Sequence, residues 1–365
     1  MRIEIRPSPF DVAEERRGPA AASDRPLRIL IYGLNFAPEL TGVGRYTGDM
    51  AAWLAEQGHE VTAVTTYPYY PHWKLAEGYP IWRWSTETWQ GVRVVRCPLW
   101  VPRRPTARKR MLHLLSFCRV GAATNLEIMA RSRVAQQLIR VYGWLLQGFD
   151  HVTTLSERMH VELRKLGRSG QLDLFPNWVD TARFRPIDGA AMRAELGVAP
   201  TDVAVLYAGN LGEKQGVESL LAIAGILEDD PRFRVVICGN GAVRSRIEAK
   251  RADHPNIILL DLQPEDKFIE LLSAADIHVL VQKHGVTQYV MPSKLGPMLA
   301  SGRPIVAQAD ERCATRRYLN DCGLVLPPDD VSGLAEALRR VGNDPELAAR
   351  MGAAARLAAS NLERG

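Results

Sequence analysis

Strand-like and helix-like segments alternate regularly through the second half of the chain, which leaves few folds open to it. The run “DVAVLYAGNLG” (202–212) is apolar and ends in a glycine turn, and “GVESLLAIAGILED” (216–229) has helical periodicity. Strands and helices that alternate at this spacing are typical of a doubly wound parallel sheet. The alternation continues through strand-like residues 233–241, 256–263, 277–282, 304–310 and 322–330, and through helix-like residues 242–253, 266–275, 292–302 and 331–344.

The first half begins with a βαβ pattern. The run “LRILIYGLNF” (27–36) is continuously apolar, as expected of a strand buried on both faces of a parallel sheet. Residues 48–57 have helical spacing, Gly58 stands where a C-terminal cap is preferred, and “EVTAVT” (60–65) is a second strand. The right-handed crossover puts the “TGVGR” loop (41–45) at the carboxyl end of the first strand, where open α/β sheets bind ligands.

These patterns predict an α/β protein with two tandem Rossmann-like doubly wound domains that face a cleft. A chain of 365 residues is long enough for two cores. We place the linker near Asp180 to Pro186, with an N-terminal domain at 27–183 and a C-terminal domain at 184–365. Residues 1–26 mix charge, Pro and Ala without apolar periodicity, and we expect a disordered extension there.

Two segments of the first half each allow two interpretations. Residues 67–100 are irregular and aromatic before a strand at 92–100, and they either pack a long loop or form a stacking pocket for a ring-shaped acceptor. The segment 101–121 is basic and runs into apolar residues, which fits either a helix on an anionic membrane surface or a solvated basic face. The bases proposed to contact membrane or acceptor are Arg103, Arg104, Arg108, Lys109 and Arg110.

Composition excludes several classes of protein. The formal charge of +5, from 46 basic and 41 acidic residues, is too mild to indicate nucleic-acid binding without a supporting motif. Five cysteines without metal-ligand spacing fit a reducing cytosol and indicate neither a disulfide framework nor zinc. No apolar run reaches the roughly 18 residues that a membrane span needs. We therefore expect a cytoplasmic protein at the inner face of the plasma membrane.

Glycine turns at the expected strand ends are candidates for an anion site, because they expose backbone N–H groups. Gly42, Gly44 and Arg45 belong to the first domain. The second domain supplies Gly209 to Gly216, then Gly239 with Gly241, and Gly302 before a later strand. Lys214 lies within the first of these turns, and we interpret it as a point charge for a diphosphate; the alternative is an ordinary surface lysine.

Other phosphate-binding classes fail on spacing. A dinucleotide fingerprint needs GxGxxG directly between strand and helix, whereas Gly42, Gly44 and Gly48 have a different spacing and begin several residues after the strand. There is no GxxxxGK[ST] segment either. The chain contains no Asp-x-Asp, so a carboxylate pair for a divalent ion is not indicated, and cations and helix N-termini would have to stabilise a leaving diphosphate. We therefore predict neither metal nor cofactor.

Four stretches together resemble family 4 glycosyltransferases of the two-Rossmann-domain (GT-B) type. They are “FAPELTGVGRYTGDMAAWLAEQGHEV”, “LFPNWVDTARFRP”, “LYAGNLGEKQGVE” and “MPSKLGPMLASGRPIVAQAD”, and they are most similar to the subgroup that builds bacterial exopolysaccharides such as colanic acid. The resemblance covers nearly the whole chain from Leu27. It implies an enzyme that transfers a sugar, with retention at the anomeric carbon, from a UDP- or GDP-sugar to a lipid-linked saccharide or polysaccharide precursor.

The resemblance also assigns roles to the domains and to single residues. It makes 27–183 the acceptor-side domain and 184–365 the nucleotide-sugar-binding domain. It implies that Lys214 and Asn210 meet the diphosphate, that backbone around Leu262 and Gln263 meets the base, and that residues 291–302 meet the ribose and sugar. The “TGVGR” loop would close on the phosphates from the acceptor side. The donor-binding residues are thus Gly42, Gly44, Arg45, Gly209, Asn210, Lys214, Gly239, Leu262, Gln263, Pro292, Ser293 and Lys294.

The chain departs from the family pattern in three places. Tyr289 and Pro297 occupy the positions of two glutamates, the second of which contacts ribose in many members, and Lys294 is expected to take part in binding instead. About 40 to 50 residues, one βαβ crossover, are missing before residue 156, so the first domain is shortened and no general base is assigned. The chain ends where relatives continue with a helix that returns to the first domain.

Two alternatives remain open at this point. A nucleotide-sugar epimerase of similar fold would need acids and histidines around the sugar, whereas the candidates here are mostly glycines and bases. A catalytically inactive nucleotide-sugar-binding or scaffold protein would keep the donor site without turnover. Among the histidines, His59 is interpreted as structural, and His72 and His113 are assigned to the surface by default.

Overall fold

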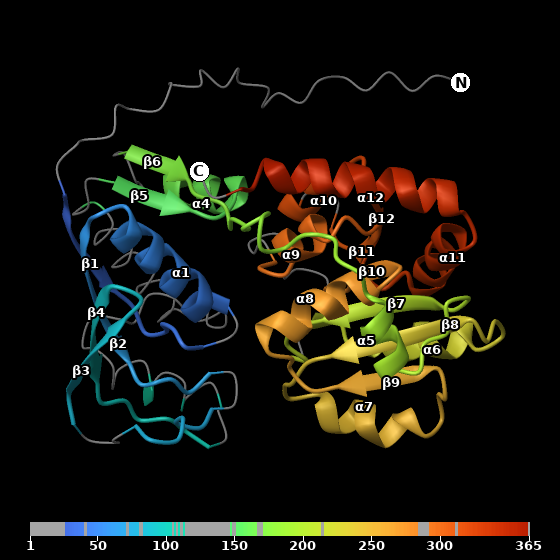
Figure 1. The fold of residues 1–365 in the computed structure, drawn as a ribbon, viewed down its shortest axis with the longest axis horizontal. Helices are drawn as coiled ribbons and strands as arrows, with labels where there is room; N and C mark the ends of the chain where they lie inside the picture. The colour runs from blue at the N-terminus through green and yellow to red at the C-terminus, as the bar shows by residue number, and fades with distance from the viewer. Residues whose placement is uncertain are drawn as a thin grey trace.

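The computed structural model describes two α/β domains that lie side by side (Figure 1). The description covers residues 26–39, 42–70, 73–79, 83–103, 106, 109, 112–113, 147, 151–165, 171–212, 215–283, 292–310 and 313–363. Residues 1–25 of the predicted extension lie outside it, as do Lys214, Arg104, Arg108 and Arg110. None of the helices described there is both long enough and apolar enough to cross a bilayer.

The second domain is built on a six-stranded sheet in the order β12-β11-β10-β7-β8-β9, and every neighbouring pair is parallel. Its strands are β7 (Val203–Ala208), β8 (Phe233–Cys238), β9 (Ile257–Leu260), β10 (Ile277–Leu280), β11 (Ile305–Gln308) and β12 (Gly323–Leu326). The order reverses beside β7, as in a doubly wound sheet. The predicted fold class is confirmed.

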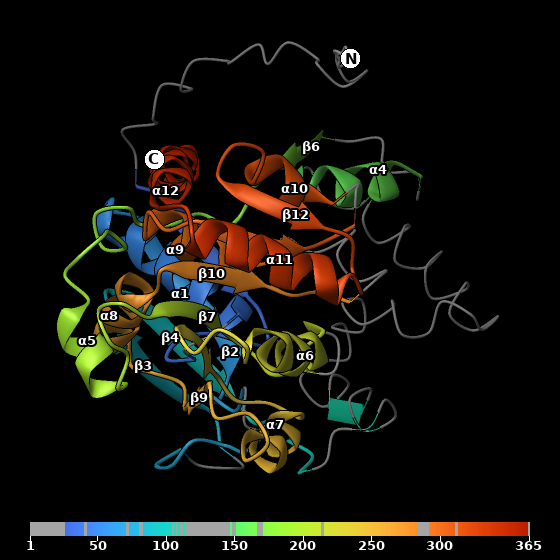
Figure 2. The same ribbon diagram turned by 90° about the vertical axis from the view of Figure 1, so that its right-hand side faces the viewer.

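Helices cover both faces of this sheet (Figure 2). On β7, Val205 and Tyr207 belong to one apolar cluster and Leu206 to the other, since successive side chains point to opposite faces. One face carries α6 (Glu218–Leu227), α7 (Arg244–Arg251) and α11 (Val331–Gly342), and the other carries α8 (Glu265–Ala274), α9 (Leu295–Ala300) and α12 (Pro345–Ser360). The short α5 (Ala190–Glu195) and α10 (Ala314–Tyr318) complete the domain among the described residues.

The helix α12 corrects the expectation that the chain closes with the helix now seen as α11. Asp344 caps α12 by accepting a hydrogen bond from the Leu347 N–H at 2.9 Å, a local signal that apolar periodicity alone does not reveal. Beyond the helix, Val179 donates its N–H to the Leu362 carbonyl at 2.8 Å. The segment after α12 therefore pairs with the chain just before the predicted linker.

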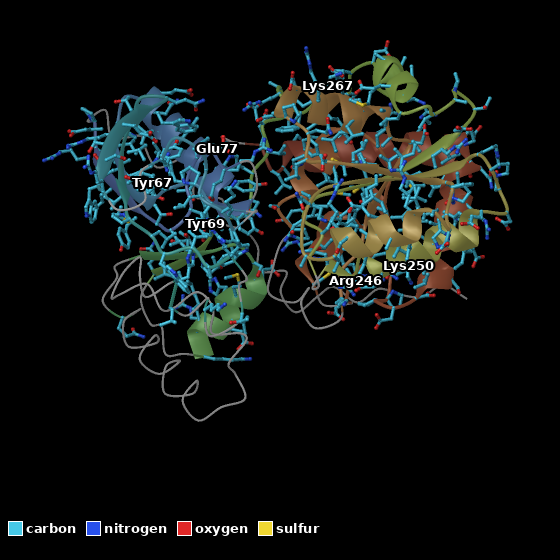
Figure 3. All side chains as sticks on the ribbon, turned by 90° about the horizontal axis from the view of Figure 1, so that it is seen from below. Tyr67, Tyr69, Glu77, Arg246, Lys250 and Lys267 are labelled. Atoms are coloured by element: carbon cyan, nitrogen blue, oxygen red, sulfur yellow. The ribbon has the colours of Figure 1, made fainter. Side chains whose placement is uncertain are left out.

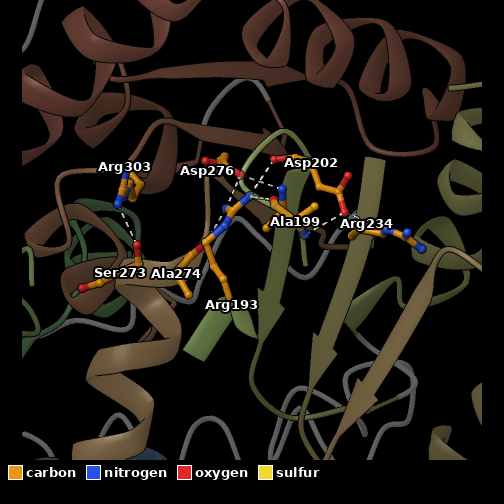
Figure 4. Close-up of polar contacts among 9 residues, drawn as sticks. Arg193, Ala199, Asp202, Arg234, Ser273, Ala274, Asp276 and Arg303 are labelled. Atoms are coloured by element: carbon orange, nitrogen blue, oxygen red, sulfur yellow. Dashed lines mark hydrogen bonds and ion pairs between the residues drawn. The ribbon is translucent and has the colours of Figure 1, made fainter. Parts of the chain in front are cut away.

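Arg193 on α5 ties the start of the second domain to its sheet (Figure 4). Its guanidinium donates to the Asp276 carboxylate at 2.7 Å, to the Ala274 carbonyl at 3.0 Å and to the Asp202 carbonyl at 2.7 Å. The same Asp276 oxygen accepts the Ala204 N–H at 2.7 Å. Because one planar guanidinium donates hydrogen bonds to several loops, it fixes these loops to one another at the amino ends of the strands.

The first domain contains a four-stranded sheet in the order β1-β2-β4-β3 and a pair of parallel strands, β5 and β6. The strands are β1 (Arg28–Tyr32), β2 (Glu60–Thr66), β3 (Ser85–Trp89), β4 (Val92–Cys97), β5 (His151–Thr154) and β6 (Gln171–Leu174), with helices α1 (Gly42–Glu56) and α4 (Glu157–Lys165). The Ser156 hydroxyl accepts the Met159 N–H at 3.3 Å, as the N-cap assignment predicted.

Two predictions for this domain were wrong. β1 is an edge strand of the described sheet rather than one buried on both faces, and Leu30 and Tyr32 remain 67% and 51% exposed. The irregular aromatic segment contains β3, which pairs antiparallel with β4. A two-residue turn, Gln90–Gly91, joins them with positive φ at both residues, the conformation that favours a tight hairpin.

His278 on β10 predicts how stability responds to acid. The side chain is 1% exposed, its Nε2 lies 2.8 Å from the Ser301 hydroxyl, and burial lowers its pKa to about 3. In the unfolded chain His278 binds a proton below its ordinary pKa of 6.5, whereas in the folded protein it stays neutral down to about pH 3. This group therefore lowers the unfolding free energy as pH falls from 6.5 toward 3. In urea titrations across this range, His278→Gln should reduce the slope by up to about 1.4 kcal/mol per pH unit. An unchanged slope would contradict the assignment.

Candidate active site

The two domains enclose a cleft of about 800 Å³ at the carboxyl ends of their sheets. The first domain lines it with Gly42, Arg45 and Tyr46 of α1 and with Tyr70. The second domain contributes the segment after β7, the segment after β9 and the residues before α9. The structure brings together Gly42, Arg45, Gly209, Asn210, Leu262, Gln263, Pro292, Ser293 and Lys294, which are predicted site residues from both halves of the chain.

Residues 42–45 of the “TGVGR” segment are not a loop before a helix, as expected, but the first turn of α1. The helix begins at Gly42, whose φ is +65°, and so it starts six residues earlier than the apolar periodicity indicated. The free N–H groups of that first turn are where a helix attracts an anion. Gly42 and Arg45 line the cleft beside this helix terminus. That they close on phosphate stays a prediction.

Some predicted residues lie behind the cleft surface instead of on it. Gly44 and Gly239 are not among the lining residues. A Cβ on Gly239 would come within 1.9 Å of the Gly209 carbonyl oxygen, so this glycine allows two turns to pack closely. Gly302 ends α9 with φ of +67° and packs near Pro186, away from the carboxyl edge. These glycines shape the site through packing.

Contacts between α1 and the second domain cross the cleft. The Tyr46 hydroxyl donates to the Ser293 carbonyl at 2.7 Å, its ring packs edge-on against Trp178 with centroids 5.4 Å apart, and burial raises its pKa to about 12. Arg45 pairs with Glu265 of α8 at 3.5 Å, and Arg183 pairs with the same carboxylate. The predicted phosphate-binding arginine is thus held by a carboxylate of the opposite domain.

Tyr46, Tyr70 and Glu265 were missed by sequence reasoning. The Asn210 amide donates to the Tyr70 hydroxyl at 3.3 Å across the cleft, and the Tyr207 hydroxyl donates to the Asn210 carbonyl at 2.8 Å. Tyr46 directly follows Arg45 in the sequence, and that adjacency was the one available signal. Nothing in the spacing of Tyr70 or Glu265 marks them, because their roles come from the meeting of two domains.

The amine of Lys294 is buried without a hydrogen bond to any described residue, and its pKa is lowered. Although the side chain as a whole is only partly buried, its Nζ is buried, has no hydrogen-bond partner in the described part of the chain and lies 3.9 Å from the centroid of the Tyr207 ring. Burial lowers its pKa to about 7. A cation that loses its hydration without gaining a partner favours the neutral amine.

Glu39 organises the other side of the cleft. Its carboxylate is 5% exposed and accepts the Tyr69 and Tyr70 N–H groups at 3.2 and 3.1 Å and the Asn35 amide at 2.9 Å. Burial raises its pKa, and these hydrogen bonds act in the opposite direction. Arg96, which is fully buried, supports the same loop by donating to the Ala37 carbonyl at 2.7 Å.

The Glu39 carboxylate leaves no room for a side chain at position 44, and a substitution at Gly44 tests this. A Cβ on Gly44 would lie 2.5 Å from Glu39 Oε2, and the hydrogen bonds to that carboxylate prevent it from moving away. A Gly→Ala change inside a helix otherwise stabilises by about 1 kcal/mol. We expect Gly44→Ala instead to lower the unfolding free energy by about 1–3 kcal/mol in urea titrations. Gly33→Ala, whose Cβ finds no atom closer than 4.0 Å, is the control, and a stabilising Gly44→Ala would refute the close contact.

The aromatic segment is mostly packing. Tyr67 and Tyr69 are 0% and 5% exposed inside the first domain, where Figure 3 labels them, and Tyr69 packs against His113 with ring centroids 4.8 Å apart. His113 is 1% exposed, so its default assignment to the surface was wrong. Arg103 and Lys109 are exposed and lie outside the cleft lining, and His72 lies outside the described residues.

Comparisons with known proteins agree with this architecture. The family described as “Glycosyl transferases group 1” matches residues 189–358, and the “Glycosyl transferase 4-like domain” matches residues 41–129. The putative colanic acid biosynthesis glycosyl transferase WcaI of Escherichia coli K12 is 31% identical over 379 residues, which cover 86% of this chain and 92% of the relative. That span exceeds the length of this chain, so the relative contains residues that this chain lacks.

Solved structures share the fold. Sucrose-phosphate synthase from Thermosynechococcus elongatus superposes with a TM-score of 0.73 at 19% identity and covers 93% of this chain and 95% of its own. Anabaena HepE in complex with UDP has a TM-score of 0.56 at 16% identity over 62% of this chain and 64% of its own.

Two domains of this architecture around one cleft have the GT-B fold. This chain belongs to the family 4 GT-B glycosyltransferases, as its sequence resemblance predicted, and it is an enzyme of that class. The epimerase and the inactive scaffold are not favoured. The shortening of the first domain stays a prediction, because residues 114–146 lie outside the described part of the chain. The domain boundaries at 27–183 and 184–365 also stay predictions.

Proposed function

We propose that this glycosyltransferase moves a sugar from a UDP- or GDP-sugar to a lipid-linked saccharide or polysaccharide precursor, with retention and without a metal ion. The observation that carries the proposal is the cleft itself, where the N-terminus of α1 faces the Gly209–Asn210 turn and Lys294. A diphosphate there meets backbone N–H groups on one side and cationic side chains on the other. The similarity to WcaI supports an acceptor from polysaccharide synthesis.

The donor would lie mainly on the second domain. The base would contact backbone at Leu262 and Gln263 after β9, and the diphosphate would lie between Asn210 and Lys294, with Lys214 completing the charge. Pro297 lines the cleft where many family members have a ribose-binding glutamate, so the ribose would have to find other partners. The UDP complex of HepE, a protein of the same fold, supports a uridine nucleotide as one candidate.

In this proposal the chemical step depends on stabilising the leaving diphosphate. As the bond from the anomeric carbon to the phosphate oxygen breaks, negative charge develops on the diphosphate, and cations together with a helix N-terminus act where that charge appears. The acceptor hydroxyl would attack from the same face, which gives retention. Arg45 would contribute when a phosphate replaces the Glu265 carboxylate as its partner.

Calorimetric titration with UDP and GDP tests the donor site. We expect micromolar binding of one nucleotide, weakened about tenfold by Lys214→Ala, which corresponds to about 1.4 kcal/mol. Lys250→Ala on α7, an exposed lysine that Figure 3 labels and that lies outside the cleft lining, is the matched control and should bind as the wild type does. If neither nucleotide binds, the donor assignment is wrong.

We also propose that the basic segment brings the enzyme to the inner face of the plasma membrane in the cytoplasm, where a lipid-linked acceptor resides. Each base near an anionic surface contributes about 1 kcal/mol at low salt. Wild-type protein should therefore sediment with vesicles that contain anionic lipid. Replacing Arg103, Arg104, Arg108, Lys109 and Arg110 with Gln should abolish this sedimentation.

A control variant separates a specific contact from net charge. Arg246→Gln, Lys250→Gln and Arg251→Gln on α7 also remove positive charge, but from a helix outside the proposed surface. This control should sediment like the wild type. Equal sedimentation of all the proteins would leave the segment as a solvated basic face.

A further inference from the structure

The buried amine of Lys294 has no hydrogen-bond acceptor among the described residues, although a buried amine normally has one. Its Nζ lies 3.9 Å from the centroid of the Tyr207 ring, its nearest aromatic neighbour. It stands close to Gly209, since a Cβ built there would lie 3.2 Å from Nζ. The amine therefore occupies the space that a glycine leaves open at the end of β7, inside the cleft lining.

Two of the acids that line the cleft with Lys294 are occupied by other groups. Glu265 is shared by Arg45 and Arg183, and Glu39 accepts the N–H groups of Tyr69 and Tyr70. Within the part of the chain that the structure describes, Lys294 forms no ion pair with a carboxylate, and burial alone accounts for its lowered pKa. Tyr207 packs against Lys294, and Lys283 lies one residue beyond the lining residue Gln282. The ionisable groups that line the cleft with Lys294 are Glu39, Arg45, Tyr46, Asp49, Glu56, Tyr70, Asp180, Arg183, Cys238 and Glu265.

We propose that Lys294 is a proton-linked anion subsite, whose amine is neutral in the empty cleft and takes a proton from solvent when the donor's diphosphate arrives beside it. This inference rests on the proposed nucleotide-sugar function and adds a regulation to it. The geometry supports it because the amine is buried without a hydrogen bond to any described residue, against an aromatic face and next to the Gly209–Asn210 turn, and an anion that enters the cleft would supply the missing partner.

The direction of the pH effect follows from the two states. In the free protein burial lowers the pKa of Lys294 to about 7. An adjacent diphosphate stabilises the ammonium and raises that pKa, so the complex binds more protons than the free protein at any pH between the two values. Affinity is then full below pH 7 and falls by up to about tenfold per pH unit above it, until the pKa of the complex is reached.

Proton uptake can be measured directly. Titrating the protein at pH 8 with UDP or GDP, whichever binds, in buffers of different ionisation enthalpy gives the number of protons absorbed with each nucleotide. We expect about one proton for the wild type, because most of the free protein then carries the neutral amine. Lys294→Met, which keeps the length and the apolar stem, should absorb none and bind at least tenfold more weakly at pH 7.

Two further variants sharpen the result. Lys294→Arg keeps a permanent charge and should bind without proton uptake and with little change in affinity between pH 7 and 8.5. Lys283→Met removes a nearby lysine that pairs with Glu218 at 3.5 Å and that does not line the cleft, so its proton uptake should match the wild type.

The outcomes are distinguishable. Nucleotide binding whose proton uptake survives in Lys294→Met, or is absent in the wild type, would overturn this inference and leave the donor site intact. Failure of the wild type to bind either nucleotide would instead contradict the proposed function on which the inference rests. Loss of uptake in both Lys294 variants, together with its retention in Lys283→Met, would support it.

Discussion

The hydrogen bond from the Tyr46 hydroxyl to the Ser293 carbonyl joins the two domains, and the shape of the cleft depends on it. Tyr46 lies on α1, one residue after Arg45, while Ser293 directly precedes Lys294. This contact therefore holds the helix N-terminus of the first domain close to the buried amine of the second. The pairing of Arg45 with Glu265 adds a charged contact to the same arrangement.

The cleft collects polar groups that a stable core would not contain. Glu39 is nearly inaccessible yet hydrogen-bonded, and the amine of Lys294 is buried without a hydrogen bond among the described residues. Buried ionisable groups reduce stability unless they are paired, and their presence at the carboxyl ends of two sheets marks a place where function outweighs packing. Gly44 and Gly209 give these two side chains the room they occupy.

Local sequence patterns predicted the second domain well and the first domain less well. The parallel sheet around β7 was predictable because apolar, β-branched runs alternate with helical segments. A strand buried on both faces needs apolar residues along its whole length, and the helices between the strands cover those faces. β3 and α12 were missed, since a Gln90–Gly91 turn and the Asp344 cap depend on single residues rather than on periodicity. The edge position of β1 was missed because an apolar run does not reveal whether a strand pairs with one neighbouring strand or with two.

The sequence by itself determined the fold class and which glycine turns stand at the carboxyl ends of the strands, because periodicity and turn residues act over short distances along the chain. The family followed from the resemblance of four sequence stretches to known glycosyltransferases. Only the tertiary structure decided that Tyr46 reaches Ser293, that Glu265 holds Arg45 and that Lys294 is buried against Tyr207. These contacts join residues far apart in sequence, and burial and partner choice depend on how separately folded segments meet. The charge state of the site is therefore a property of the assembled cleft.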